Sequence, residues 1–148
     1  MKTIDSFKNE YAFLSNFYPC FVEYEGLRFP SVEHAYQAAK CRDRSDMVKF
    51  TVMPTPGEAK KAGRLVAMRD DWEIIKLDVM NDLVAQKFER PDLKAKLLQT
   101  RDSEIVEGNW WNDTFWGVCK GVGCNHLGKI LMNVRNSICK NDPKIVEY

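Results

Sequence analysis

Residues 29–40 read Phe29-Pro-Ser-Val-Glu-His-Ala-Tyr-Gln-Ala-Ala-Lys40, and this stretch says most about the fold. A proline and a serine are typical of a helix start, so we predict a helix over residues 32–41. Glu33, Gln37 and Lys40 recur at i, i+4 and i+7 and therefore share one face. The alanines between them are small enough to let neighbouring elements approach closely. Two interpretations stay open: the wall of an active site, or an ordinary solvated helix face.

The size and composition of the chain indicate one globular domain. It has 148 residues, of which 45% are hydrophobic, so we expect residues 1–148 to form a single compact domain with a sizeable core. The formal net charge is +1, from 22 basic and 21 acidic residues, which argues against a strongly basic, non-specific nucleic-acid binder. We find neither a run of about 20 apolar residues nor the apolar core of a signal peptide. The expectation is a cytoplasmic protein that does not bind a membrane.

Cysteine and histidine usage predicts neither disulfides nor a metal site. The five cysteines are an odd number without a C-x-x-C pair, and neither of the two histidines lies at zinc-ligand spacing from a cysteine. We therefore expect most of the thiols to be buried, and neither a metal nor a cofactor.

Periodicity and turn residues outline the remaining elements. Short extended pieces are expected over residues 1–29, with a hairpin turning at Gly26, and a strand over residues 103–107. Helices are expected at about residues 43–50, 55–68, 70–88, 91–98 and 125–138. The predicted class is a mainly helical α+β fold with a small β-sheet.

Two segments mix aromatic rings with polar side chains. Residues 11–18 contain Asn16 and Phe17, and either pack on the core or stack a flat heterocycle. Residues 108–117 contain three tryptophans interleaved with Asn112 and Asp113, a mixture that favours binding of a base or sugar. The glycine-rich stretch 120–129 is either a flexible loop or a cradle for a phosphate.

The chemistry available to these residues suits cleavage of an N-glycosidic bond. The chain has no G-x-S-x-G and no H-E-x-x-H motif, which leaves carboxylates, a lysine and aromatic rings. A carboxylate can stabilise an oxocarbenium-like centre or activate water. A lysine amine can instead attack the anomeric carbon and form an imine with the opened sugar. Glu33 and Lys40 are about 10 Å apart in helix rise, so a substrate would have to lie along the helix.

Five motifs in this order resemble the NADAR, or YbiA-like, family over nearly the whole chain. They are Phe13-Leu-Ser-Asn-Phe17, residues 29–40, Arg69-Asp-Asp-Trp72, Asn112-Asp-Thr-Phe-Trp-Gly117 and Asn125-His-Leu-Gly128. The resemblance implies a mainly helical α+β fold and an N-glycosidase. Such enzymes act on phosphoribosylamino-pyrimidine intermediates of riboflavin synthesis, or remove ADP-ribose from guanine.

The resemblance also implies site residues. Glu33, Lys40 and Asp113 match the family's candidate catalytic groups, with Lys40 as a candidate Schiff-base nucleophile. Substrate contacts are expected from Asn16, Phe17, Gln37, Trp72, Asn112, Trp116, Gly117 and Asn125. Two departures are Ala35, where an aromatic residue is common, and the Val122 and Cys124 of the glycine-rich stretch.

Three functions remain open from the sequence. The first is a hydrolase of N-glycosidic bonds, acting on a small nucleotide or on ADP-ribosylated nucleic acid. The second is a non-catalytic module that binds ADP-ribose or a related NAD-type nucleotide, and the third is a scaffold domain without a ligand. Nothing in the sequence indicates an obligate protein partner.

Overall fold

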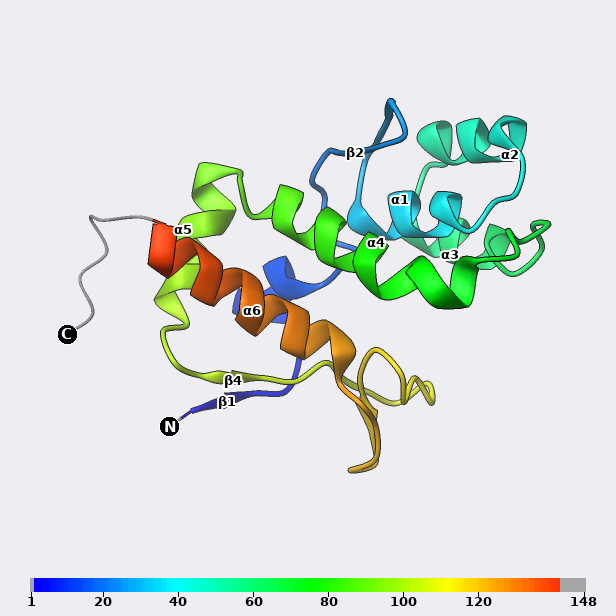
Figure 1. The fold of residues 1–148 in the computed structure, drawn as a ribbon. Coiled ribbons are helices and arrows are strands. Elements are labelled where there is room, and N and C mark those ends of the chain that lie inside the picture. The colour runs from blue at the N-terminus through cyan, green and yellow to red at the C-terminus, as the bar shows by residue number, and fades with distance from the viewer. Residues whose placement is uncertain (1, 142–148) are drawn as a thin grey trace. The chain divides into compact units, whose positions relative to one another are not determined.

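The computed structural model describes residues 2–141 of the chain (Figure 1). The chain divides into two compact units. One comprises the chain up to Ser15 together with everything from Phe88 onward, and the other is Asn16–Lys87. Each unit is described by itself below, and a single domain over residues 1–148 stays a prediction. The mainly helical α+β class is confirmed by the element content.

The Asn16–Lys87 unit begins with the predicted hairpin. Strands β2 (Val22–Tyr24) and β3 (Leu27–Phe29) pair antiparallel. The two residues between them, Glu25 and Gly26, both have positive φ, at 51° and 76°. Such a two-residue turn matches the twist of the flanking strands, and glycine adopts it at no steric cost. The turn at Gly26 is therefore confirmed.

Helix α1 (Val32–Ala39) follows the hairpin and is buried along its whole length. The Ser31 side chain caps it by accepting a hydrogen bond from the His34 N–H at 3.1 Å. Because even Glu33 and Gln37 are buried, the interpretation of a solvated helix face is wrong. The helix ends two residues earlier than predicted, and Lys40 is its C-cap.

Four further elements complete this unit: α2 (Arg44–Lys49), the 3₁₀ turn η2 (Phe50–Val52), α3 (Pro56–Ala62) and α4 (Trp72–Lys87). The Thr55 side chain caps the start of α3 by accepting a hydrogen bond from the Glu58 N–H at 3.1 Å. Helix α3 ends at Ala62, six residues before the predicted end. Leu65 beyond it is 87% exposed, so no apolar surface is buried that would favour continuing the helix.

The other unit is built around two helices and four short strands. Helices α5 (Pro91–Gln99) and α6 (His126–Asn141) accompany β1 (Thr3–Ile4), β4 (Glu104–Ile105), β5 (Gly108–Asn109) and β6 (Val118–Cys119). Strands β1 and β4 lie side by side in Figure 1 and pair in parallel, as do β5 and β6. The predicted small sheet is thus several two-stranded ladders.

The N-terminal segment differs from the extended pieces predicted for it. Residues 9–14 form a 3₁₀ helix, η1 (Asn9–Leu14), whose Phe13 and Leu14 are buried. The Phe13 ring meets the Phe88 ring edge-on at a centroid distance of 6.3 Å. Two successive inward side chains suit the tighter 3₁₀ turn better than a strand, in which neighbours point to opposite faces.

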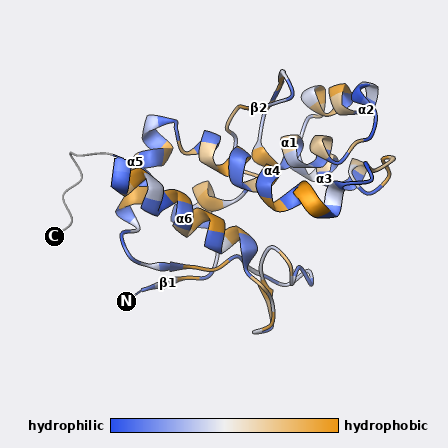
Figure 2. Cartoon of the chain, viewed as in Figure 1, coloured by the Kyte–Doolittle hydropathy of each residue, from blue (hydrophilic) through white to orange (hydrophobic). Residues whose placement is uncertain are grey.

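Helix α6 buries one apolar face. Leu127, Ile130, Leu131 and Val134 are buried, whereas Ile138 is only partly covered. Figure 2 shows hydrophobic and hydrophilic residues recurring along this helix, as expected for one buried face.

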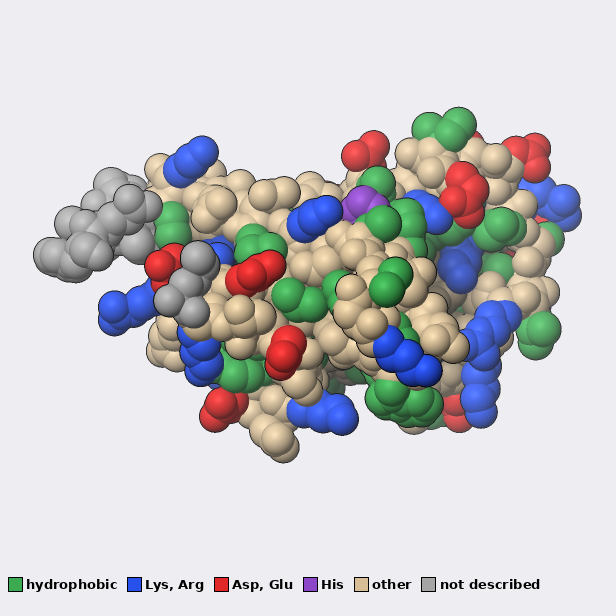
Figure 3. Space-filling model, turned by 90° about the horizontal axis from the view of Figure 1, so that it is seen from below, with side chains coloured by type: hydrophobic (Ala, Val, Ile, Leu, Met, Phe, Trp, Pro, Cys, Tyr) green, Lys and Arg blue, Asp and Glu red, His purple; other side chains and the backbone are tan. Residues whose placement is uncertain are grey.

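The surface carries both signs of charge. Figure 3 shows Lys and Arg side chains spread among Asp and Glu on one face, in line with the net charge of +1. No helix among residues 2–141 is both long and apolar enough to cross a lipid bilayer. All five cysteines are free thiols, of which three are buried.

Candidate active site

A buried carboxylate–amide pair lies on α1. Gln37 Nε2 donates a hydrogen bond to Glu33 Oε1 at 2.8 Å, and both side chains are at least 90% buried. The pair forms because residues four apart stack on one helix face. The Glu33 backbone N–H donates to the Asn16 carbonyl at 3.1 Å, which fixes the start of the helix against the preceding loop. A carboxylate removed from water in this way can take part in proton transfer.

Gln37 is held in place from its other side by Gly63. A Cβ atom on Gly63 would lie 1.9 Å from Gln37 Oε1, so only glycine allows α3 to approach this closely. Gln37 Oε1 is buried and has no hydrogen-bond partner among the described residues. The amide therefore has one end packed against a backbone and the other directed at Glu33.

Lys40 lies at the end of the same face, in partly buried surroundings. Its Nζ is 5.7 Å from the centroid of the Tyr36 ring. Burial lowers the pKa of Lys40 below its ordinary value, and the nearby cations Arg64 and Lys76 lower it further, while Glu33 opposes the shift. A lysine in these surroundings has a larger neutral fraction near pH 7 than an exposed one, and the neutral amine is the nucleophile.

An aromatic contact connects α1 to α4 in this region. The Tyr36 and Trp72 rings lie 5.2 Å apart at 55°, and both are buried. Trp72 therefore lies in the core. Lys76, one turn further along α4, forms an ion pair with Glu73 at 2.6 Å. Packing of α4 against α1 places Trp72 against Tyr36 and brings Lys76 near Lys40.

The loop before the hairpin contributes Asn16 and Phe17. Asn16 Nδ2 donates to the Met80 sulfur at 3.5 Å, which directs this side chain toward α4. The Phe17 ring is 42% exposed, and the Lys60 ammonium of α3 lies 6.0 Å from its centroid. The exposed ring provides a surface on which a flat group can stack.

The second group of predicted site residues belongs to the other unit. Asp113 Oδ1 accepts the Trp116 N–H at 2.9 Å and the Phe115 N–H at 3.2 Å, which makes the Asp113–Trp116 segment a tight turn. Asn109 closes the turn from the opposite side, since its amide donates to the Asp113 carbonyl at 2.8 Å. These bonds hold Asp113 in one orientation, and a catalytic role for it stays a prediction.

Gly117 and Asn125 both have structural roles. A Cβ atom on Gly117 would lie 1.7 Å from Glu107 Oε2, so glycine is needed where β6 approaches β5. Asn125 has φ of 54°, its side-chain oxygen accepts the Glu107 N–H at 2.9 Å, and its amide donates to the Ile105 carbonyl at 3.0 Å. Its side chain thus ties the start of α6 to β4. Substrate contacts by these two residues stay predictions.

The rest of this loop is partly exposed. Trp116 packs edge-on against Phe115 at 4.8 Å, and Asn112 has φ of 64°. The glycine-rich stretch forms a tight turn, in which Cys119 and Val122 exchange backbone hydrogen bonds. Among residues 2–141, no cluster of three or more His, Cys, Asp or Glu side chains is arranged to hold a metal ion.

A model of the NADAR domain matches residues 4–139. The chain belongs to the NADAR domain family. It is 37% identical over 135 residues to an N-glycosidase of Nostoc punctiforme, an alignment that covers 86% of each chain. It is 37% identical over 137 residues to a riboflavin biosynthesis protein of Vibrio vulnificus, covering 90% of this chain and 37% of that protein.

The N-glycosidase YbiA of Escherichia coli is also similar, at 33% identity over 137 residues, or 90% of this chain and 85% of that protein. An NMR structure of the E. coli protein YbiA matches the fold with a TM-score of 0.84 and 31% identity, covering 100% of this chain and 92% of that one. The family and the fold class expected from the five motifs are therefore confirmed.

Sequence reasoning missed four residues around this NADAR site. Tyr36 and Gly63 shape it by packing, and Arg64 and Lys76 add positive charge near Lys40. Only spacing could have indicated two of them, because Tyr36 precedes Lys40 by one turn and Lys76 follows Trp72 by one turn. Gly63 and Arg64 gave no signal, since their roles depend on where α3 lies.

Proposed function

We propose that this chain is an N-glycosidase that hydrolyses the bond between a ribose and a base or amine. The observation that carries the proposal is the buried Glu33 carboxylate on the same helix face as Lys40, whose pKa is lowered. The Nostoc and E. coli relatives are both named N-glycosidases, which supports the same reaction class.

Glu33 and Lys40 divide the reaction between them. Opening of the ribose ring leaves C1′ joined to the base nitrogen as an imine, and the neutral Lys40 amine adds to C1′ to give a geminal diamine as one amine proton moves to the base nitrogen. The C1′–N bond to the base then breaks as the Lys40 nitrogen gives its second proton to Glu33 and forms the C1′=N imine. Glu33 supplies the proton with which the base leaves. Water then hydrolyses the C1′=N imine, which releases the sugar and restores the amine. Gln37 keeps the Glu33 carboxylate oriented through their 2.8 Å hydrogen bond.

The substrate is a ribosylated base with a phosphate on the sugar. The Lys40 surroundings include the cations Arg64 and Lys76, and Lys60 lies beside the exposed Phe17 ring. Cations beside an aromatic surface suit a phosphate at one end and a flat base at the other. Phosphoribosylamino-pyrimidines and ADP-ribosylated guanine both have this composition, and the Vibrio relative's link to riboflavin biosynthesis supports the former.

A trapping experiment tests the covalent step. Each substrate is incubated with the protein and borohydride, with ADP-ribosylated guanine supplied both as a nucleoside and in DNA or RNA. We expect turnover of at least one, and a reduced adduct on the tryptic peptide that contains Lys40. Lys40→Arg should abolish adduct and turnover, whereas Lys61→Arg, an exposed control on α3, should keep both.

Two other outcomes of this experiment would each support an alternative mechanism or function. Turnover without an adduct, together with an active Lys40→Arg variant, would mean direct attack by water. Binding of ADP-ribose without turnover of any substrate would overturn the proposal in favour of the non-catalytic nucleotide-binding module.

A further inference from the structure

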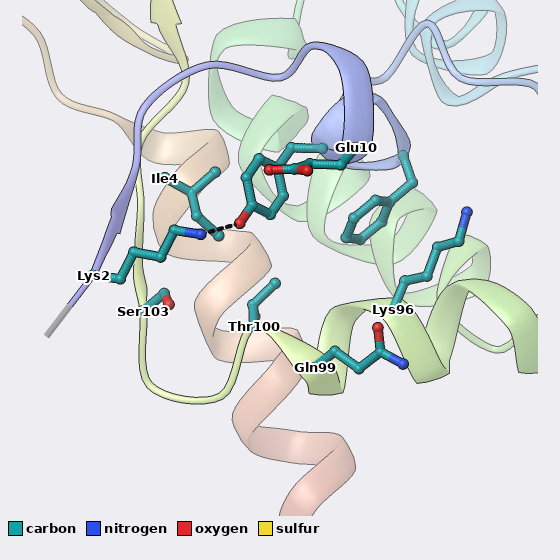
Figure 4. Close-up of a pocket in the computed structure, with 9 residues that line it drawn as sticks. Lys2, Ile4, Glu10, Lys96, Gln99, Thr100 and Ser103 are labelled. Atoms are coloured by element: carbon teal, nitrogen blue, oxygen red, sulfur yellow. Dashed lines mark hydrogen bonds between the residues drawn. The ribbon is translucent and has the colours of Figure 1, made fainter.

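A hollow of about 320 Å³ lies in the unit that contains α5 and α6 (Figure 4). It is lined by β1, η1, the end of α5 and the turn before β4, and none of its lining residues has been assigned to the glycosidase reaction. This volume is at the lower end of the range for small-molecule sites. Its floor includes the buried apolar side chains of Ile4 and Phe13.

Hydrogen-bond donors converge on this hollow. Lys2 Nζ donates to the Tyr11 hydroxyl oxygen, as Figure 4 shows, which leaves the Tyr11 O–H proton to donate elsewhere. Ser103 lines the same hollow, and its hydroxyl is the third donor. Lys96 adds a second positive charge, and Glu10 contributes one opposing negative charge.

The third positive charge belongs to Arg135, which is buried next to a residue that lines the hollow. Arg135 of α6 is 5% exposed, and its Nη1 donates to Thr100 Oγ1, which lines the hollow, at 2.8 Å. Its Nε has no hydrogen-bond partner in the described part of the chain. No carboxylate among residues 2–141 comes within ion-pair distance of this guanidinium.

A buried guanidinium is normally compensated by an anion, because desolvating an unpaired charge is costly. Asp102 is the acidic residue whose field acts on Arg135. Lys2, Lys96 and Arg135 carry three positive charges against the two negative charges of Glu10 and Asp102, so the hollow favours an anion. Thr100 cannot supply a proton to an anion, since its hydroxyl already donates to the Leu97 carbonyl at 2.6 Å. Direct contact must therefore come from the other donors.

We propose that this hollow binds a small organic anion. Its carboxylate or phosphate head group contacts Lys2, the Tyr11 hydroxyl and the Ser103 hydroxyl, and its apolar body lies against Phe13 and Ile4. Arg135 and Lys96 act through their charge. The site is independent of the proposed glycosidase reaction.

Binding of simple probes to the full chain tests the site. Benzoate and phenyl phosphate provide the two head groups on one ring, and benzyl alcohol is the neutral analogue. Titrations followed by amide chemical shifts should saturate for at least one anion, with the largest changes at Lys2, Thr100 and Ser103. Preference for one anion identifies the head group. No saturable shift with either anion, or equal binding of benzyl alcohol, would overturn the proposal.

Variants then locate the contacts. Tyr11→Phe and Ser103→Ala each remove one donor to a charged group, which should weaken anion binding about tenfold. Lys2→Gln should weaken it similarly while leaving the weak binding of benzyl alcohol unchanged. Lys140→Gln, on an exposed lysine of the same unit outside the hollow, is the matched control. If all these variants bind the anion as the wild type does, the assigned contacts are wrong and the proposal fails.

Discussion

At the scale of the residue, the Glu33 carboxylate is the most consequential group. It is 7% exposed, and the Gln37 amide donates to it at 2.8 Å. A buried carboxyl group held by a positioned donor is well placed to take part in proton transfer.

Glu33→Gln is expected to lose about 10²–10⁴-fold in kcat, because the near-isosteric amide cannot transfer a proton. The melting temperature should change little, since the amide can still accept from Gln37. Turnover and thermal unfolding measured on the same preparation check both points, with Glu89→Gln, on an exposed glutamate, as the control. Wild-type turnover by Glu33→Gln would remove this residue from the mechanism.

His34 has a structural role that depends on pH. Its ring lies buried between the Ser31 hydroxyl at 2.7 Å and the Met53 carbonyl at 3.0 Å. A carbonyl only accepts, so Nε2 carries the proton and Nδ1 accepts from Ser31. Burial lowers the pKa of His34 below its usual value of 6.5, and the Met53 carbonyl partly offsets the shift.

The unfolded chain therefore binds more protons than the folded one between pH 6.5 and the lower folded pKa. We expect the free energy of unfolding to decrease as the pH falls through this window, and to level off below the folded pKa. Urea midpoints measured across pH 4–7 should show the decrease, and His34→Gln should flatten it. An unchanged pH dependence in His34→Gln would assign the effect to other groups.

At the scale of the element, the contact between α1 and α3 decides the geometry of the site. Gly63 ends α3 directly against the Gln37 side chain, and a Cβ there would meet Oε1 at 1.9 Å and Cδ at 2.7 Å. Gly57, in the same helix, would place its Cβ 3.8 Å from Thr55 Oγ1, which is an ordinary contact. The two glycines thus differ in packing although both lie in or at the end of one short helix.

Gly63→Ala is expected to destabilise the fold by about 1–3 kcal/mol, because the added methyl group displaces Gln37. The displaced amide would release Glu33, so kcat should fall as well. Gly57→Ala should be neutral or stabilising by about 0.5–1 kcal/mol, since alanine is the better helix former. Denaturant unfolding and turnover of the two variants provide the comparison. Equal effects of both substitutions would contradict this account of the contact.

At the scale of the whole molecule, the five thiols differ in burial and therefore in expected reactivity. Cys20, Cys41 and Cys119 are buried, whereas Cys124 is exposed. Burial is the main cause that raises the pKa of the Cys41 thiol to about 11. The thiolate is the reactive form, so both burial and pKa protect Cys41.

Iodoacetamide at pH 8 is expected to modify Cys124 in the folded protein well before Cys41 and the other buried thiols. Peptide mass spectrometry over a time course measures the order, and labelling in urea gives the limit in which all five react. Rapid modification of Cys41 under native conditions would show that its surroundings open more readily than its packing indicates.

The sequence by itself determined the family, the α+β class, the hairpin at Gly26 and the shared face of Glu33, Gln37 and Lys40. These follow from local periodicity, turn chemistry and motif order, which act over a few residues. Tertiary structure decided where α3 ends, that the polar face of α1 is buried, and that Tyr36, Gly63 and Arg64 surround it. It also decided the roles of Asn125 and of the buried Arg135. These features depend on contacts between elements distant in sequence, and periodicity along one element carries no information about its neighbour.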